Sequence, residues 1–260
     1  MNIKTFNNFK EVFGDIENKF NNEAHGIKTE KWQGIKLNFE MKEIFNFSFS
    51  VPLINFNFDN FKEEIKPNLP WAENHFLERV GKEPLNPGLE WKNWPYASSA
   101  NNFRTEKEKF THTYMERYWP KYANNQGNIP NGGIRYDYGD LNDVIQLLKK
   151  EPLTRQAFLP VWFPEDTGVS HGGRVPCSIG YQFIRRFDYF HIIYWIRSCD
   201  YIRHFRDDIY LTIRLTMFIL QNLKEQKEWK EVEMGYYTQH TTSLHIFNSD
   251  FKLLKKGKKL

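Results

Sequence analysis

The spacing of hydrophobic residues predicts two helices, and helix-start signals predict a third. Apolar side chains at steps of four and three predict a buried helix over residues 205–223, with Asp207 as its N-cap and Asp208 in its first turn. The same periodicity predicts a helix over residues 140–150. A third helix is expected to open after Pro70, where an acidic residue falls in the first turn.

Strands are predicted where apolar residues alternate with polar ones or where β-branched and aromatic residues gather. Residues 45–58 alternate in this way, with Pro52 as a break. Residues 157–163 form a further candidate strand. Residues 178–198 predict two strands that turn near Asp188. Strands and helices therefore share one chain, which is typical of a mixed α/β (α+β) protein.

Composition favours one large domain. The 260 residues are 40% hydrophobic and 17% aromatic, which is enough for a large core, and no linker or repeat divides them. We therefore expect a single domain over residues 1–260. The net charge of +4 is mild, and much of the excess lies in residues 251–260, which predict a solvated tail, with DNA contact as the alternative.

The same composition excludes several classes of protein. Two cysteines do not make a disulfide framework, so both thiols are expected to be free in a reducing cytoplasm. The polar opening of the chain does not resemble a signal peptide, and no apolar run is long enough to span a membrane. The histidines and cysteines lack metal-ligand spacing, so no metal is expected.

A candidate site follows from the ends of the predicted strands. Cys177 lies between a proline and a strand, and the next apolar run ends in Arg197, Ser198 and Asp200. Strand ends gather at one edge of a sheet, where ligand sites of α/β proteins lie. Arg197 would there lower the pKa of the thiol and bind an anion. Without further context, the pattern favours an inert buried thiol at Cys177.

Two segments, "RVPCSIGYQF" and "IRSCDYIRHFRDD", resemble the thymidylate synthase family. That family has a Pro-Cys nucleophile followed five residues later by Gln, then Arg-Ser-x-Asp, seven residues and a base-reading Asn; here Gln182 and Asp208 take the last positions. The resemblance covers about residues 70–250 and leaves residues 1–65 unmatched. It implies the thymidylate synthase fold, a mixed sheet flanked by helices, and a homodimer whose sheets pack at the interface.

The resemblance also implies a nucleotide site. Arg197 and Ser198 would bind the phosphate together with Arg155 of the other subunit, although Gln156 replaces the family's second arginine there. Asp200 would contact the base or the adjacent loop, Gln182 would orient the thiol loop, and His245 would meet the sugar hydroxyl. Phe247 replaces the family's Tyr and cannot donate a hydrogen bond, so ribose and deoxyribose both stay open.

The change of Asn to Asp at the base-reading position favours cytosine. A carboxyl group complements the N3 acceptor and N4 donor of cytosine, whereas Asn complements uracil. Phage deoxycytidylate 5-hydroxymethylases carry the same change, and this branch is the one that the chain resembles most. A register shifted by one residue would give the role to Asp207. A dUMP hydroxymethylase, a thymidylate synthase variant and a non-catalytic nucleotide-binding homologue are the alternatives.

The chemistry that the resemblance implies needs 5,10-methylenetetrahydrofolate. Cys177 adds to C6 of dCMP, C5 attacks the methylene group of the folate, and water adds to the exocyclic methylene. The product, 5-hydroxymethyl-dCMP, serves modified phage DNA in the host cytoplasm, with other phage nucleotide-metabolism enzymes as partners. Glu73 is the expected acid/base residue, with Glu78 as its rival. The residues expected to stack on the folate, unless they are ordinary core aromatics, are Trp91, Trp94 and Tyr114.

Overall fold

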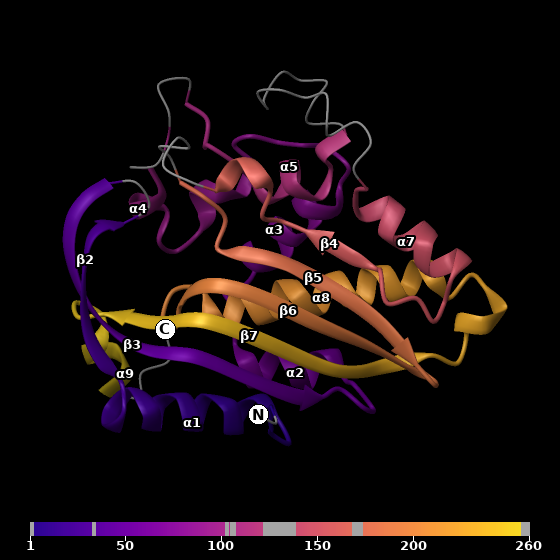
Figure 1. Ribbon diagram of the computed structural model, residues 1–260, viewed down its shortest axis with the longest axis horizontal. Coiled ribbons are helices and arrows are strands. Elements are labelled where there is room, and N and C mark those ends of the chain that lie inside the picture. The colour runs from indigo at the N-terminus through magenta and orange to yellow at the C-terminus, as the bar shows by residue number, and fades with distance from the viewer. Residues whose placement is uncertain are drawn as a thin grey trace.

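A mixed seven-stranded sheet forms the centre of the protein (Figure 1). The computed structural model describes residues 3–32, 35–101, 104, 108–121, 139–167 and 174–255. The strand order is β1-β3-β7-β6-β5-β4, and β2 pairs with β3 outside this path. The strands are β1 (Lys4–Thr5), β2 (His25–Trp32), β3 (Ile35–Pro52), β4 (Phe158–Pro160), β5 (Ser178–Arg186), β6 (Tyr189–Asp200) and β7 (Glu233–Phe247).

The sheet combines parallel and antiparallel pairs. β6 and β7 are parallel, with Ser198 opposite Ser243, so the carboxyl ends of these two strands meet at one edge. β5 is antiparallel to β6, and it therefore begins at this same edge. β3 is antiparallel to β7 from Met41 to Pro52, so the first 65 residues, which no family pattern matched, contribute strands to the same sheet.

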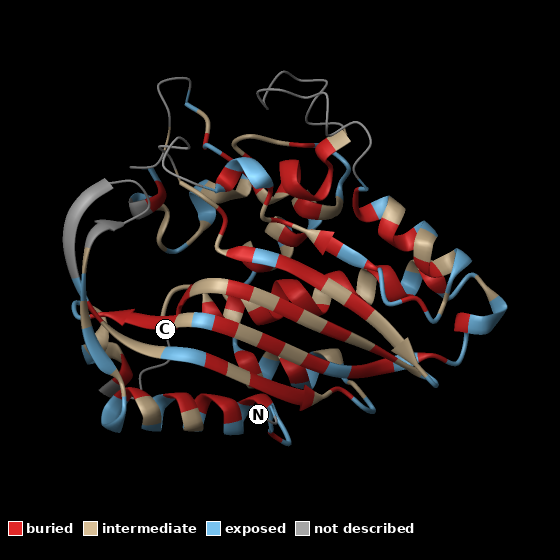
Figure 2. Ribbon diagram, viewed as in Figure 1, coloured by how far each residue is buried: buried red, intermediate tan, exposed pale blue. Residues whose placement is uncertain are grey.

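Helices cover one face of the sheet. Figure 1 shows the long helix α8 behind β5, β6 and β7, and Figure 2 shows the buried residues that alternate along these strands. Tyr181, Ile192 and Tyr237 are buried on the covered face, as are Ile209 and Ile213 of α8. The helices are α1 (Phe9–Asn22), α2 (Phe58–Ile65), α3 (Trp71–Val80), α4 (Ala97–Asn101), α5 (Tyr114–Tyr118), α7 (Leu141–Lys150), α8 (Phe205–Leu223) and α9 (Phe251–Lys255), with 3₁₀ turns η1 (Glu90–Asn93), η3 (Pro164–Asp166) and η5 (Lys227–Trp229).

The predicted helices are confirmed, with one error at a helix start. α3, α7 and α8 lie where the apolar periodicity placed them, and α7 begins with a capping box at Asp140. Asp207 is not the N-cap of α8: the helix begins at Phe205 with His204 in the cap position, and no side chain caps it. Asp207 and Asp208 both lie in the first turn.

The predicted strands differ from the structure mainly at their ends. The hairpin of β5 and β6 turns at Phe187 and Asp188 as expected. The strand predicted over 45–58 starts earlier and ends at Pro52, where the missing N–H suits a strand end. Of the strand predicted over residues 157–163, only residues 158–160 form a strand in the structure.

Two of the predictions concern the C-terminal tail and the length of the helices. Of the predicted Lys-rich tail, residues 256–260 lie outside the described residues. Among the helices that the structure describes, none combines the length and apolar composition needed to cross a membrane.

Candidate active site

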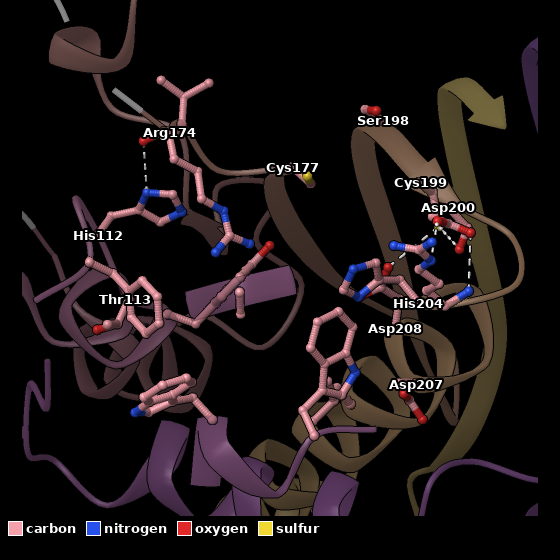
Figure 3. A pocket seen from close by; sticks show the side chains of 18 of the residues that line it. His112, Thr113, Arg174, Cys177, Ser198, Cys199, Asp200, His204, Asp207 and Asp208 are labelled. Atoms are coloured by element: carbon pink, nitrogen blue, oxygen red, sulfur yellow. Dashed lines mark hydrogen bonds and ion pairs between the residues drawn. The ribbon is translucent and has the colours of Figure 1, made fainter. Parts of the chain in front are cut away.

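A cavity of about 600 Å³ lies at the carboxyl ends of β6 and β7. Its other walls come from α3, the start of α8, and the segment that leads into α5. Figure 3 shows Arg174 and His112 on one side, Asp208 and His204 on the other, and Cys177 between them. The cavity brings together most of the predicted site residues, namely Cys177, Arg197, Ser198, Asp200, Asp208, His245, Trp91, Trp94 and Tyr114.

Arg197 holds the loop that presents Cys177. Its backbone N–H donates to the Cys177 carbonyl (2.9 Å). Its guanidinium donates from Nε to the Pro176 carbonyl (2.8 Å) and from Nη2 to the Val175 carbonyl (3.1 Å). The half-buried thiol of Cys177 faces the cavity from this loop. One arginine thus fixes the backbone on which the candidate nucleophile stands and places positive charge beside it.

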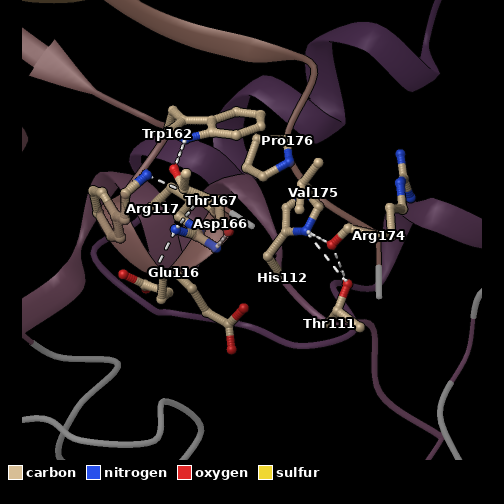
Figure 4. A network of polar contacts seen from close by, with 12 residues as sticks. Thr111, His112, Glu116, Arg117, Trp162, Asp166, Thr167, Arg174, Val175 and Pro176 are labelled. Atoms are coloured by element: carbon tan, nitrogen blue, oxygen red, sulfur yellow. Dashed lines mark hydrogen bonds and ion pairs between the residues drawn. The ribbon is translucent and has the colours of Figure 1, made fainter. Parts of the chain in front are cut away.

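A second set of hydrogen bonds holds the start of this loop (Figure 4). The Arg174 carbonyl accepts hydrogen bonds from Thr111 Oγ1 (2.7 Å) and from His112 Nδ1 (3.1 Å). A carbonyl only accepts, so Nδ1 of His112 carries the hydrogen. Each backbone carbonyl from residue 174 to residue 177 accepts at least one hydrogen bond. These hydrogen bonds restrain the backbone at Cys177.

A buried ion pair between Arg117 and Asp166 lies near Trp162 (Figure 4). Arg117 of α5 donates two hydrogen bonds to Asp166 of η3, at 2.9 and 2.8 Å, and both side chains are buried. The Trp162 ring, four residues before Asp166, lies 5.5 Å from the Arg197 guanidinium. The pair therefore joins α5 to the segment that packs on Arg197.

Asp208 and Asp207 differ sharply in what their carboxylates contact. Both oxygens of Asp207 accept hydrogen bonds from Asn68, one from the backbone and one from the side chain, each 2.8 Å long. Asp208 Oδ2 lies 3.5 Å from the Cys199 thiol, which donates to it. Burial raises the pKa of Asp208 to about 7, although Arg79 and the Cys199 thiol act in the opposite direction. Both acids line the cavity, but Asn68 occupies both oxygens of Asp207, whereas Asp208 has only the weak Cys199 hydrogen bond to its side chain among the described residues.

Asp200 and His245 lie side by side at the ends of β6 and β7. Asp200 Oδ1 accepts from the backbone N–H groups of Ile202 and Arg203, and burial raises its pKa to about 6. Burial lowers the pKa of His245 to about 4, so the ring is neutral at pH 7. Its buried Nδ1 has no hydrogen-bond partner among the described residues and is available to a ligand.

Aromatic rings form one wall of the cavity. Trp94 stacks on His204 at 4.7 Å between ring centres, and burial lowers the pKa of His204 to about 3. Trp91 packs edge-on against Phe110 at 5.5 Å. The Tyr114 hydroxyl hydrogen-bonds Ser178 Oγ at 2.9 Å. The buried Nε1 of Trp94 has no partner in the described part of the chain, so this wall fits a flat ligand that carries an acceptor.

Helix α3 turns Glu78, and not Glu73, towards the cavity. Glu73 pairs with Arg214 at 2.7 and 2.8 Å and accepts from the Tyr210 hydroxyl at 2.6 Å, and it does not line the cavity. The Arg214 hydrogen bond lowers its pKa. Glu78 lines the cavity instead. Five residues correspond to about 140° of helix rotation, so the two side chains cannot share a face.

Gln182 and Arg155 also lie outside the cavity. Gln182 Nε2 donates to the Arg155 carbonyl at 2.9 Å, and the Arg155 side chain is exposed. The strand alternation places Gln182 on the face of β5 away from α8, because Tyr181 and Phe183 are buried against the helices. Neither residue orients the thiol of its own chain.

The sequence analysis missed several residues that line the cavity. Arg79 is buried, with its guanidinium 4.1 Å from the Tyr114 ring centre, and its charge acts on Asp208. His75 precedes it by one helical turn. Trp71, His75, Glu78 and Arg79 recur at helical spacing, so periodicity along α3 would have identified this face.

No group of three or more His, Cys, Asp or Glu side chains suited to a metal ion occurs in the part of the chain that the structure describes.

The site belongs to an α+β protein with a thiol, arginines and a buried acid at the edge of a mixed sheet. No protein-family model matches the sequence, and no curated protein matches it. Solved structures do match. One is the thermostable thymidylate synthase A from Bacillus subtilis, with a TM-score of 0.66 and 16% identity, over 96% of this chain and 83% of that one. The chain therefore has the thymidylate synthase fold.

Proposed function

We propose that the protein is a folate-dependent deoxycytidylate 5-hydroxymethyltransferase. The observation that carries the proposal is Asp208, a buried acid with a pKa of about 7 in the cavity that also contains Cys177 and Arg197. A pyrimidine edge that takes both a donor and an acceptor from one carboxyl group suits an acid at this position, whose one side-chain hydrogen bond among the described residues comes from the Cys199 thiol.

Cytosine offers that edge. In its protonated form, Asp208 donates to N3 from one oxygen and accepts from the N4 amino group with the other. Uracil presents N3–H and O4, so the ionised Asp208 carboxylate could accept from N3–H but would face the O4 acceptor with its second oxygen, which also only accepts. Such buried mismatches discriminate strongly, since the polar groups lose water and gain no partner.

The chain's own residues supply nucleotide binding and the nucleophile. Cys177 would add its thiolate to C6. Arg197 and Ser198 face the cavity and would bind the phosphate. His245 Nδ1, which lacks a partner among the described residues, would meet the sugar hydroxyl.

The aromatic wall fits 5,10-methylenetetrahydrofolate. Trp91, Trp94 and Tyr114 would hold it by stacking, and the unpaired Trp94 Nε1 would donate to it. When bound, this folate supplies a one-carbon unit at the oxidation level of formaldehyde.

A homodimer is part of the proposal. Figure 1 shows no described helix over the sheet face turned to the viewer. Phe158 and Tyr236 are 37% and 38% exposed, and Ile193 and Trp195 are half-buried. An apolar sheet face of this kind is typical of a subunit interface. Arg155 is exposed and outside its own cavity, which fits a role in the partner's phosphate site. Light scattering after gel filtration should give a dimer, and Trp195→Glu should give a monomer.

Tritium release tests the proposed reaction. The purified protein with methylenetetrahydrofolate should release tritium from [5-³H]dCMP and form 5-hydroxymethyl-dCMP, identified by mass. Parallel reactions with dUMP test the dUMP hydroxymethylase and thymidylate synthase alternatives, and a methylated product would refute the hydroxymethylase. No release from either nucleotide would favour the non-catalytic homologue.

A further inference from the structure

The cavity contains a second pair of titratable groups, which the steps above do not use. His75 Nδ1 lies 3.3 Å from Glu78 Oε2, one helical turn apart on the cavity face of α3. Burial lowers the pKa of His75 to about 4, and the Arg79 charge acts in the same direction. Hydrogen bonds from His75 and the backbone hold the pKa of Glu78 below its ordinary value, although burial opposes this. At pH 7 the pair is a neutral imidazole beside a carboxylate.

The protons of this pair are fixed by its neighbours. Glu78 Oε1 accepts from the backbone N–H groups of Leu89 and Glu90, and Oε2 accepts from His75. A carboxylate only accepts, so Nδ1 of His75 carries the hydrogen and Nε2 carries a lone pair. Both carboxylate oxygens of Glu78 are occupied by protein donors. The basic atom left to a ligand is therefore His75 Nε2.

Packing holds the imidazole in the wall of the cavity. The His75 ring stacks on Trp71 at 5.1 Å and 18°, and 15% of the His75 side chain is exposed. Nε2 has no partner among the described residues. A Cβ at Gly88 would lie 2.7 Å from Glu78 Oε2, so a larger residue there would displace this carboxylate.

We propose that His75 is the general base that takes the proton from the water in the hydroxymethyl-forming step, with Glu78 as its positioning residue. The inference rests on the proposed function. The arrangement matches the carboxylate–histidine unit of hydrolases, in which the carboxylate fixes the tautomer and stabilises the imidazolium. The charged groups that act on His75 are Glu78 and Arg79 of α3 and Glu90 of η1.

The step balances without an oxidant or reductant. The water oxygen bonds to the exocyclic methylene carbon, the C5=CH₂ electron pair forms C4=C5, and the C4=N3 pair moves onto N3, where it stays until C4=N3 re-forms as the thiol leaves. His75 Nε2 takes the water proton. The C4=C5 pair then forms C5=C6, and the C6–S bond breaks with its electrons on Cys177. The product is the hydroxymethylated base and the free thiolate.

Oxygen-18 exchange tests this step without the folate. By microscopic reversibility, the wild-type protein with 5-hydroxymethyl-dCMP in H₂¹⁸O should exchange the hydroxyl oxygen, measured by mass. His75→Gln should slow the exchange at least about 100-fold, the usual contribution of a general base. It should retain dCMP affinity in calorimetry. With enzyme and methylenetetrahydrofolate in excess over [5-³H]dCMP, so that only a single turnover is followed, tritium release should stay within about threefold, because this step precedes water addition.

Two further variants separate catalysis from structure. Glu78→Gln can donate to Nδ1 and favour the Nε2–H tautomer, so exchange should fall at least about tenfold. Asn74→Ala, on the exposed side of α3, should match the wild type. Exchange in His75→Gln within threefold of wild type, or an equal fall of exchange and tritium release, would overturn the inference. A wild-type protein that releases no tritium instead refutes the proposed function.

Discussion

The exchange of Asp208 for asparagine is the sharpest test of base recognition. An asparagine side chain in place of the acid would present one fixed acceptor and one fixed donor, which suit uracil and oppose cytosine. We expect Asp208→Asn to lose activity on dCMP and to gain it on dUMP. The overall fold should persist, because Asp208 makes only one side-chain hydrogen bond in the described structure, from Cys199.

The magnitude follows from the two base contacts. Each buried mismatch leaves a donor or acceptor unpaired at a cost of about 1–3 kcal/mol. Two contacts give about 2–6 kcal/mol, and 1.4 kcal/mol corresponds to a factor of about ten. The ratio of kcat/KM for dCMP to that for dUMP should therefore fall by a factor between about 30 and about 20,000.

A competition assay measures this ratio directly. Both tritiated nucleotides compete in one reaction, and the relative rates of release give the relative kcat/KM values. Asp207→Asn is the matched control: its carboxylate binds Asn68, so the ratio should not move. A ratio within threefold of wild type in Asp208→Asn would refute base recognition by this residue.

The pH dependence adds a second signature. Recognition of cytosine needs one shared proton, either on Asp208 or on N3, so kcat/KM for dCMP should fall as the pH rises through about 7. Asp208→Asn has no such proton, and this limb of the profile should disappear.

Three further predictions follow from burial and charge. Cys177→Ala should abolish tritium release and retain dCMP binding in calorimetry; residual turnover would exclude it as the nucleophile. Because the folded pKa of Asp208 is raised above 3.8 to about 7, the free energy of unfolding should fall by about 4 kcal/mol from pH 4 to pH 7 and then level off. Urea titrations at several pH values should show this slope reduced in Asp208→Asn, and equal slopes would contradict the burial argument. Arg117→Met should cost about 3–5 kcal/mol in urea unfolding because it removes the cation that faces the buried Asp166 carboxylate. Lys121→Met, which breaks a half-exposed pair, should cost at most about 1 kcal/mol.

Local sequence patterns predicted the elements that position the site. The apolar periodicity of residues 205–223 and the alternation of residues 178–198 reflect burial of one helix stripe and one strand face, so each is visible without the rest of the fold. The spacing of Cys177, Arg197 and Asp208 places them at strand and helix ends that meet in the cavity.

Contacts between distant segments could not be predicted in this way. The sequence predicts Asp207 as a helix N-cap, yet its carboxylate binds Asn68, which lies 139 residues earlier. Glu73 and Glu78 look equivalent on α3, and only the packing of α3 against α8 decides which one faces the cavity. That packing depends on side chains from two helices at once, which the pattern of either helix alone does not contain.

Glu73 shows how a residue outside the cavity still shapes it. Its ion pair with Arg214 and its hydrogen bond from Tyr210 tie α3 to α8 on the side away from the ligand. On the other side, α3 carries His75 and α8 carries Asp208. His75, proposed to take the proton from water, and Asp208, proposed to recognise the base, therefore lie on separate helices. The contacts of Glu73 hold these two helices together. Because one helix turn separates neighbouring side chains by about 5.4 Å, a slip of either helix would misplace one proton relative to the other.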